Sequence, residues 1–136
     1  KRPAYIYGKK ADIIFHAAGN AGNGIFQEAK FINQARPAKK RVWVIGVDTN
    51  QSNLGNYFAK GGQEANFVLT SVITGINVAT EDIATHSYKE EFPGKKTIVY
   101  GLKNNVISIL PGQIDPNTWK EVQIARTKIL TGKIKI

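Results

Sequence analysis

The chain has 136 residues, a length that fits one domain with a modest core. Its 42% hydrophobic and 21% charged residues are an ordinary balance for a globular protein, so the composition argues against disorder. Because the sequence contains no cysteine, disulfides, thiol catalysis and thiolate metal sites are excluded. The apolar runs are short, and none approaches the roughly 18 residues of a membrane-spanning helix.

The net charge of +9 would allow binding to nucleic acid or to an anionic membrane surface. The lysines are nevertheless spread along the chain. The densest basic runs, Lys39–Arg41 and Lys95–Lys96, come just before predicted strands, where lysines usually protect sheet edges. We therefore interpret the charge as a solvated basic surface, and we expect no nucleic-acid partner.

The first predicted elements surround a glycine-rich turn. Residues 1–10 read as a helix end and a turn, and because the chain opens abruptly we expect a fragment or a processed piece of a longer protein. Asp12–Ala17 is the first strand, and its uninterrupted apolar run predicts a central parallel strand covered on both faces. The glycine turn follows, and Asn23–Ile32 has the spacing of an amphipathic helix.

A second strand, Arg41–Val47, follows this helix and is strongly apolar. Strand, helix and strand form a crossover, for which a right-handed parallel βαβ unit is the economical interpretation. Residues 49–66 are rich in Asn, Gly and Gln, which predicts a loop. Phe67–Thr70 is a short third strand.

The remaining elements complete an α/β fold with a Rossmann-like parallel sheet and flanking helices. Ser71–Ser87 reads as a helix. Thr97–Leu102 and Val106–Leu110 read as two strands of a hairpin. Asp115, followed by proline, is a helix N-cap, and Gly132 is a plausible stop for that helix.

The glycine turn and Asp48 are the candidate binding features. Gly19, Gly22 and Gly24 give G-x-x-G-x-G, which differs from the G-x-G-x-x-G of dinucleotide-binding folds. Asp48 ends the second strand, so it projects over the same sheet edge as the Gly19 turn. A carboxylate there can accept two hydrogen bonds from a vicinal diol such as a sugar. The same residue could equally stabilise the turn-rich segment that follows it.

The remaining histidine and serine residues form no recognisable catalytic or metal-binding motif. His16 stands alone in a strand, where a packing role is the commoner one, and no His or carboxylate cluster indicates a metal. There is no G-x-S-x-G nucleophile elbow, and nothing marks Ser71 as activated. We therefore predict no catalytic residue, no metal and no cofactor.

Four blocks of the sequence carry a family resemblance. In order, they are ADIIFHAAGNAGNGIFQEAK, VWVIGVDTNQ, FVLTSVITGINVA and YGLKNNVISI. They resemble the basic membrane protein family, the PnrA-like substrate-binding lipoproteins of nucleoside ABC transporters, over most of residues 11–136. The resemblance implies one lobe of a type I periplasmic-binding-protein fold, in which two Rossmann-like lobes clamp a nucleoside.

The resemblance also implies residue roles. Residues 1–136 would be the C-terminal lobe, with residues 71–91 crossing back towards a missing N-terminal lobe. Ala18, Gly19 and Asn20 would face the ligand, and Asp48 would hold ribose hydroxyls. Family members commonly read TSxxK after the third strand, and Thr74 stands here in place of that cleft lysine. This departure bears on the affinity or the identity of the ligand.

The function that the resemblance implies is solute binding without catalysis. The full-length parent would bind nucleosides, purine nucleosides above all, in an interlobe cleft and deliver them to an ABC transporter permease. It would be lipid-anchored on the extracytoplasmic face of the cell membrane. The alternative is a regulatory or protein-interaction domain of the same fold, which could form a homodimer through an exposed face of helix 71–87.

Overall fold

A computed structural model describes residues 7–135, which form two compact units. Among these residues, the first unit comprises residues 7–72 and Ile109–Ile114, and the second comprises Ile73–Ser108 and residues 115–135. Most of the expected helix end at residues 1–10 lies outside the described residues. The chain therefore passes between the units at three points, and each unit is described by itself.

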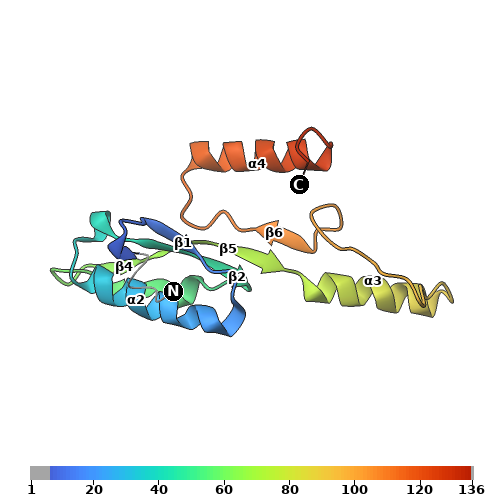
Figure 1. The fold of residues 1–136 in the computed structure, drawn as a ribbon, viewed down its shortest axis with the longest axis horizontal. Coiled ribbons are helices and arrows are strands. Elements are labelled where there is room, and N and C mark those ends of the chain that lie inside the picture. Colours follow the sequence, from blue (N-terminus) through green and yellow to red (C-terminus); the bar gives the residue numbers. More distant parts are fainter. Residues whose placement is uncertain (1–6, 136) are drawn as a thin grey trace. The chain divides into compact units, whose positions relative to one another are not determined.

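A four-stranded sheet has the strand order β1-β2-β5-β6 (Figure 1). β1, β2 and most of β5 belong to the first unit, while the last two residues of β5 and the first two of β6 are counted with the second. Its strands are β1 (Ile13–Phe15), β2 (Trp43–Asp48), β5 (Val68–Thr74) and β6 (Ile107–Ile109). β1 and β2 are parallel, as the expected βαβ unit requires. The chain after β6 runs antiparallel to β5, because the Leu110 N–H donates to Ser71 and the Gln113 N–H donates to Leu69. The sheet is thus mostly parallel, with an antiparallel edge.

Helix α2 (Asn23–Gln34) contributes Phe26 and Ala29 to the core of the first unit. It begins directly after the 3-10 turn η1 (Gly19–Gly22) and packs against β2. The Asn33 side chain, near its end, exchanges two hydrogen bonds with the backbone of Val42. These contacts tie the helix to the start of β2. The buried core residues around them include Ile14, Val44, Tyr57, Phe67 and Val68.

β1 is an edge strand, not the central strand that its sequence predicts. Ile14 is buried, but Ile13 is 47% and Phe15 49% exposed. An uninterrupted apolar run indicates that both faces of a strand carry apolar side chains. It does not indicate that another layer of the protein packs on both faces. The face of the sheet away from α2 is therefore open at β1 within the described structure.

The expected loop at residues 49–66 contains structure that the sequence analysis missed. After the short η2 (Ala38–Lys40) and β2, the chain forms η3 (Ser52–Gly55) and then β3 (Asn56–Phe58) and β4 (Glu64–Asn66). β3 and β4 pair antiparallel. Each strand is only three residues long and stands in a segment rich in Asn, Gly and Gln, so the strand pattern is not visible in the sequence. The Asn66 amide stabilises the pair by donating to Ser52 O and Asn56 Oδ1.

The third strand is longer than expected. Residues 71–74 continue β5, and helix α3 (Ile76–Tyr88) begins only after Gly75. The β-branched residues Val72, Ile73 and Thr74 explain the difference, because they favour strand over helix.

In the second unit, α3 and α4 (Pro116–Leu130) contain no buried residue. The Asp115 N-cap is confirmed, since its side chain accepts hydrogen bonds from the N–H groups of Asn117 and Thr118, both at 3.1 Å. Gly132 follows the helix with φ +72°, as a helix stop requires. Among the described residues, no helix is long and apolar enough to span a membrane.

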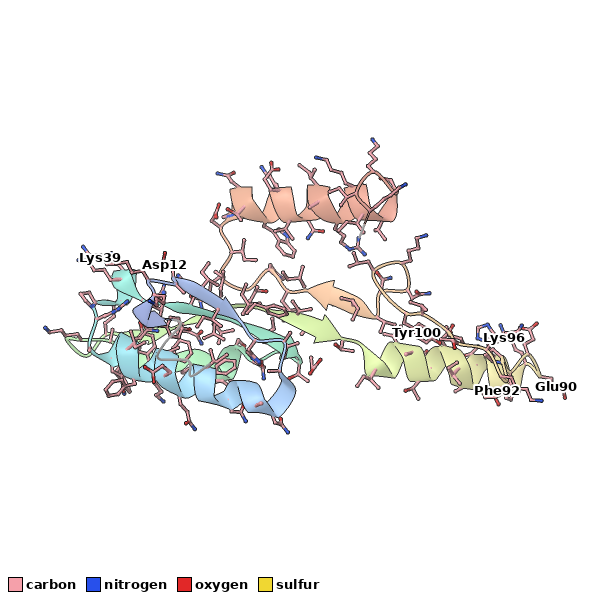
Figure 2. All side chains as sticks on the ribbon, in the orientation of Figure 1. Asp12, Lys39, Glu90, Phe92, Lys96 and Tyr100 are labelled. Atoms are coloured by element: carbon pink, nitrogen blue, oxygen red, sulfur yellow. The ribbon has the colours of Figure 1, made fainter. Side chains whose placement is uncertain are left out.

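The expected hairpin at residues 97–110 is wrong. Only Ile107–Ile109 forms a strand, and it pairs in the main sheet. Residues 97–102 are irregular, and Val99 is 83% exposed. Tyr100 lies beside α3 and its hydroxyl donates to Asp82 Oδ2 at 2.8 Å (Figure 2). This segment has turn-type backbone bonds, in which Gly101 O accepts from the N–H groups of Val106 and Ile107, and no strand ladder. Lys95 and Lys96 consequently precede no strand.

Candidate ligand-binding site

The glycine turn lies at the carboxyl end of β1. Ala18, Gly19 and Asn20 are exposed there. Gly19 has φ +48°, a left-handed conformation that glycine adopts at little cost, and it opens η1. The N-cap residue of α2, Gly22, makes no side-chain capping hydrogen bond. The turn therefore presents backbone groups and the first turn of a helix at the surface of the first unit.

Asp48 is the last residue of β2, the strand next to β1. Because β1 and β2 are parallel, their carboxyl ends meet at one sheet edge, where ligands bind in open α/β folds. Asp48 is exposed and has φ +67°, and the Thr49 N–H donates to Val47 O at 2.8 Å beneath it. The structure thus brings Asp48 and the Gly19 turn to the same edge, in agreement with the topology expected from sequence.

Thr74 is half-buried and ends β5, and by its contacts it belongs to the second unit.

The sequence analysis missed Gln51. Its side-chain oxygen accepts a hydrogen bond from the Val47 N–H at 2.9 Å and lies 3.0 Å from His16 Nε2. His16 is buried and packs edge-on against the Phe26 ring, so its expected packing role is confirmed. No local signal in the sequence identifies Gln51, because its partner His16 is 35 residues away in the sequence.

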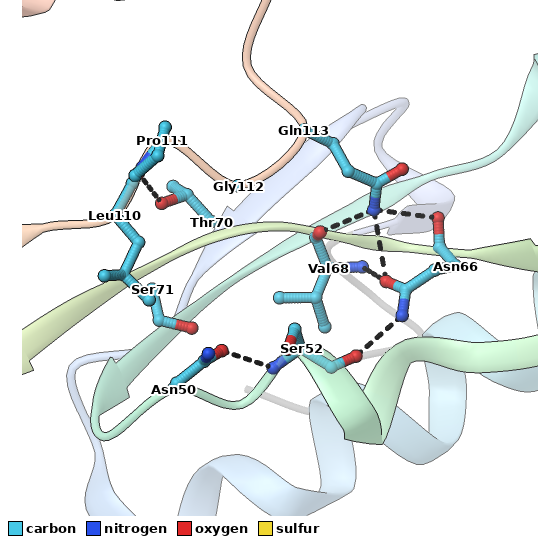
Figure 3. Close-up of a pocket in the computed structure, with 10 residues that line it drawn as sticks. All are labelled: Asn50, Ser52, Asn66, Val68, Thr70, Ser71, Leu110, Pro111, Gly112 and Gln113. Carbon is cyan, nitrogen blue, oxygen red and sulfur yellow. Dashed lines mark hydrogen bonds between the residues drawn. The ribbon is translucent and has the colours of Figure 1, made fainter.

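A cavity of about 530 Å³ lies elsewhere in the first unit (Figure 3). None of the five predicted site residues lines it. The Gln113 amide donates to Asn66 and Val68, and the Thr70 hydroxyl donates to Leu110 O. These polar groups already bond to one another, so they hold the segment after β6 against β5. Its lining residues are Asn50, Ser52, Asn66, Val68, Thr70, Ser71, Leu110, Pro111, Gly112 and Gln113.

The Tyr7 hydroxyl is an ionisable group of the first unit with a structural role. Burial, reinforced by the Glu28 carboxylate, raises the pKa of the Tyr7 hydroxyl well above its usual range, and that hydroxyl donates to Trp43 O. Among the described residues, no group of three or more His, Cys, Asp or Glu could hold a metal ion. The arrangement at the strand ends offers hydrogen-bonding groups and one carboxylate to a ligand.

A mostly parallel α/β sheet with flanking helices is the architecture of one lobe of a periplasmic-binding-protein fold. The sequence model of one family, described as ABC transporter substrate-binding protein PnrA-like, matches residues 4–136. The chain belongs to this family.

Named relatives agree with this assignment. The chain is 37% identical over 133 residues to the "ABC transporter nucleoside-binding protein BmpA" of Lactococcus lactis, with 98% of this chain and 38% of the relative covered. It is 39% identical to the "CD4+ T-cell-stimulating antigen" of Listeria monocytogenes (96% and 37% covered). It is 30% identical to "Basic membrane protein A" of Borreliella afzelii (95% and 36% covered). The chain thus spans well under half the length of these relatives.

Proposed function

We propose that the chain is the C-terminal lobe of an ABC transporter substrate-binding protein that binds nucleosides. The observation that carries this proposal is the placement of Asp48 and the Gly19 turn at the ends of two adjacent parallel strands. The family and the nucleoside-binding relative in Lactococcus lactis support the ligand class. We favour purine nucleosides among the ligands, and no chemical step is required of the protein.

In the proposed complex, the Asp48 carboxylate accepts hydrogen bonds from the two ribose hydroxyls. Ala18, Gly19 and Asn20 approach the ligand through their backbone, which the open turn allows. Thr74, in the second unit, carries a short hydroxyl where the resembled family pattern has a lysine. Closure of a second lobe over this edge would bury the ligand and supply contacts to its base.

The two-lobe organisation is also part of the proposal. Helices α3 and α4 bury no residue of their own, and Ile76 of α3 is 68% exposed. Amphipathic helices of a folded protein normally bury an apolar stripe. We infer that the segment predicted at residues 71–91 crosses back to pack on an N-terminal lobe from Ile73 onwards, since Ser71 and Val72 belong to the first unit. The full-length protein would be lipid-anchored outside the cytoplasm and would deliver its ligand to a transporter permease.

The test is calorimetry of the full-length protein with purine and pyrimidine nucleosides. Replacing Asp48 with Ala should weaken binding by about 2–3 kcal/mol, the loss of a charged hydrogen-bonding partner. The matched control is Asp12→Ala, since Asp12 is an exposed aspartate at the amino end of β1 (Figure 2). Equal affinity of the Asp48→Ala and Asp12→Ala proteins would remove Asp48 from the site.

A regulatory or interaction role of the same fold is the second candidate. The exposed apolar residues of α3, Ile76 and Tyr88 among them, favour it because they suit a protein partner. The oligomeric state of residues 1–136, measured by light scattering, helps to distinguish the interaction role from the solute-binding role. A stable dimer that Ile76→Ser dissociates, together with a full-length protein that binds no nucleoside, would favour the interaction role.

A further inference from the structure

The ends of three neighbouring strands meet at one residue, Gln51. Its side-chain oxygen accepts from the Val47 N–H in β2 at 2.9 Å and lies 3.0 Å from His16 Nε2, just beyond β1. Its own N–H donates to the hydroxyl of Ser71 in β5 at 3.1 Å. His16 and Ser71 are 2% and 1% exposed. Gln51 therefore connects β1, β2 and β5 at the edge that carries the candidate site.

The contact with the Gln51 oxygen determines which ring nitrogen of His16 carries the proton when the ring is neutral. An amide oxygen only accepts, so His16 must donate through Nε2–H, and its Nδ1 carries no proton in the neutral ring. Nδ1 is buried and has no hydrogen-bond partner among the described residues. Gly22 lies against this side of the ring, where a Cβ would collide with it, and Phe26 packs edge-on with ring centroids 5.1 Å apart. The His16 ring thus packs directly against Gly22, the last residue of the glycine turn.

The same contacts involve Gly46 and Val47, the two residues before Asp48. A Cβ on Gly46 would lie 2.6 Å from Ser71 Oγ and 2.8 Å from Gln51 Oε1, so only glycine leaves room for Gln51 here. Asp48 has φ +67°, a left-handed conformation that, glycine apart, Asp and Asn adopt more readily than other residues and that neighbouring contacts help to hold. The bond from Val47 to Gln51 closes the chain around Asp48 and contributes to that constraint.

We propose that Gln51 is a positioning residue, which through His16 and Val47 holds the glycine turn and Asp48 in the arrangement that binds ligand. This inference rests on the proposed function. Gln51 need not contact the ligand. Its acceptor oxygen is the essential atom, since both the strand end and the histidine bond to it.

The experiment compares three variants of the full-length protein. Gln51→Met keeps the length of the side chain and removes the acceptor, and we expect nucleoside affinity to fall at least tenfold. Gln51→Glu keeps an acceptor and should stay within about fivefold of wild type. Asn33→Ala removes a buried amide at the opposite end of β2, and it should lower stability without changing affinity. Equal affinities of the Met and Glu variants would overturn the proposal.

Two measurements on the ligand-free protein test the role of Gln51 independently of nucleoside binding. Hydrogen exchange of the Val47 amide should accelerate at least tenfold in Gln51→Met and return towards wild type in Gln51→Glu. Nitrogen NMR should find the His16 proton on Nε2. If the wild-type protein binds no nucleoside, the proposed function fails, while these two measurements still decide whether Gln51 organises the edge. Unchanged Val47 exchange in Gln51→Met, or a proton on Nδ1, would overturn that role.

Discussion

The two units of the chain differ in how they bury their apolar residues. The first unit encloses a core in which Phe67 and Val44 are fully buried between the sheet and α2. In the second unit, α3 and α4 bury no residue, and Tyr88 of α3 is 91% exposed. Both units contain amphipathic elements, so composition does not explain the difference. The difference arises because α2 packs against the sheet in the first unit, whereas α3 and α4 bury no residue within the described structure.

This difference separates what the chain stabilises itself from what it presents to a partner. The strand ends that carry the glycine turn and Asp48 belong to the unit with its own core. The second unit instead contains an open groove of about 610 Å³ along α3, with apolar side chains from Ile76, Ala79, Ile83, Phe92 and Val106 among its lining. The site should therefore depend on the first unit, and the second unit should depend on whatever covers α3.

The largest expected effect is in the core of the first unit. Phe67 is fully buried and its ring packs against those of Phe26 and Tyr57. Phe67→Ala should lower the free energy of unfolding by about 3–5 kcal/mol, through lost burial and a residual cavity. Phe92→Ala, at a 61% exposed position in the second unit, should change it by less than about 0.5 kcal/mol. Urea denaturation measures both, and similar losses would contradict the contrast between the units.

A smaller loss is expected for a polar contact of the same core. Asn33 is fully buried and satisfies both the N–H and the carbonyl of Val42, at 2.8 and 2.9 Å. Asn33→Ala should cost about 2–3 kcal/mol, because it leaves buried backbone groups without partners. The exposed Asn53→Ala is the control, and it should be nearly neutral in the same denaturation experiment. A neutral Asn33→Ala would mean that water replaces the amide.

Parallel strand order made the main features of the site predictable. An apolar run, a glycine turn and a second apolar run ending in Asp48 suffice to place turn and carboxylate together, because parallel neighbours share an edge. Gln51 could not be found this way, since its role depends on contacts with His16 and Ser71 across the fold. The β3–β4 hairpin was missed because its strands are only three residues long and lie in a segment rich in Asn, Gly and Gln, and because the Asn66 contacts with Ser52 and Asn56 leave no pattern in the sequence.

The proposed second lobe can be tested by comparing one substitution in two proteins. Ile76→Ala should change the stability of residues 1–136 by less than about 0.5 kcal/mol, since Ile76 is 68% exposed. In the full-length protein it should cost about 2 kcal/mol, as for a buried isoleucine. Val44→Ala, in the core of the first unit, should cost the same in both and serves as the control. An equally small effect of Ile76→Ala in both proteins would mean that no lobe covers α3.

The smallest expected effect concerns the start of α4. Hydrogen bonding to Thr118, and then to Asn117, lowers the pKa of the Asp115 carboxyl below its usual value. A lowered pKa in the folded state means that the cap stabilises fully above the unfolded pKa, about 3.9, and loses this contribution as pH falls through the folded pKa. Because Asp115 is exposed, the contribution is small, but α4 buries no residue and so depends more on its cap.

The measurement is hydrogen exchange of the Asn117 and Thr118 amides between neutral pH and about pH 3, corrected for intrinsic exchange. Wild type should lose protection with acid, Asp115→Ala should lack it at every pH, and Asp115→Asn should keep a pH-independent cap because its oxygen accepts without titrating. Other carboxylates titrate in this range as well. The difference in acid-induced loss of protection between the wild type and Asp115→Asn therefore isolates the contribution of the Asp115 carboxylate. Identical acid loss in the Asn variant would assign the effect elsewhere, and α4 would then owe its order to contacts beyond its own first turn.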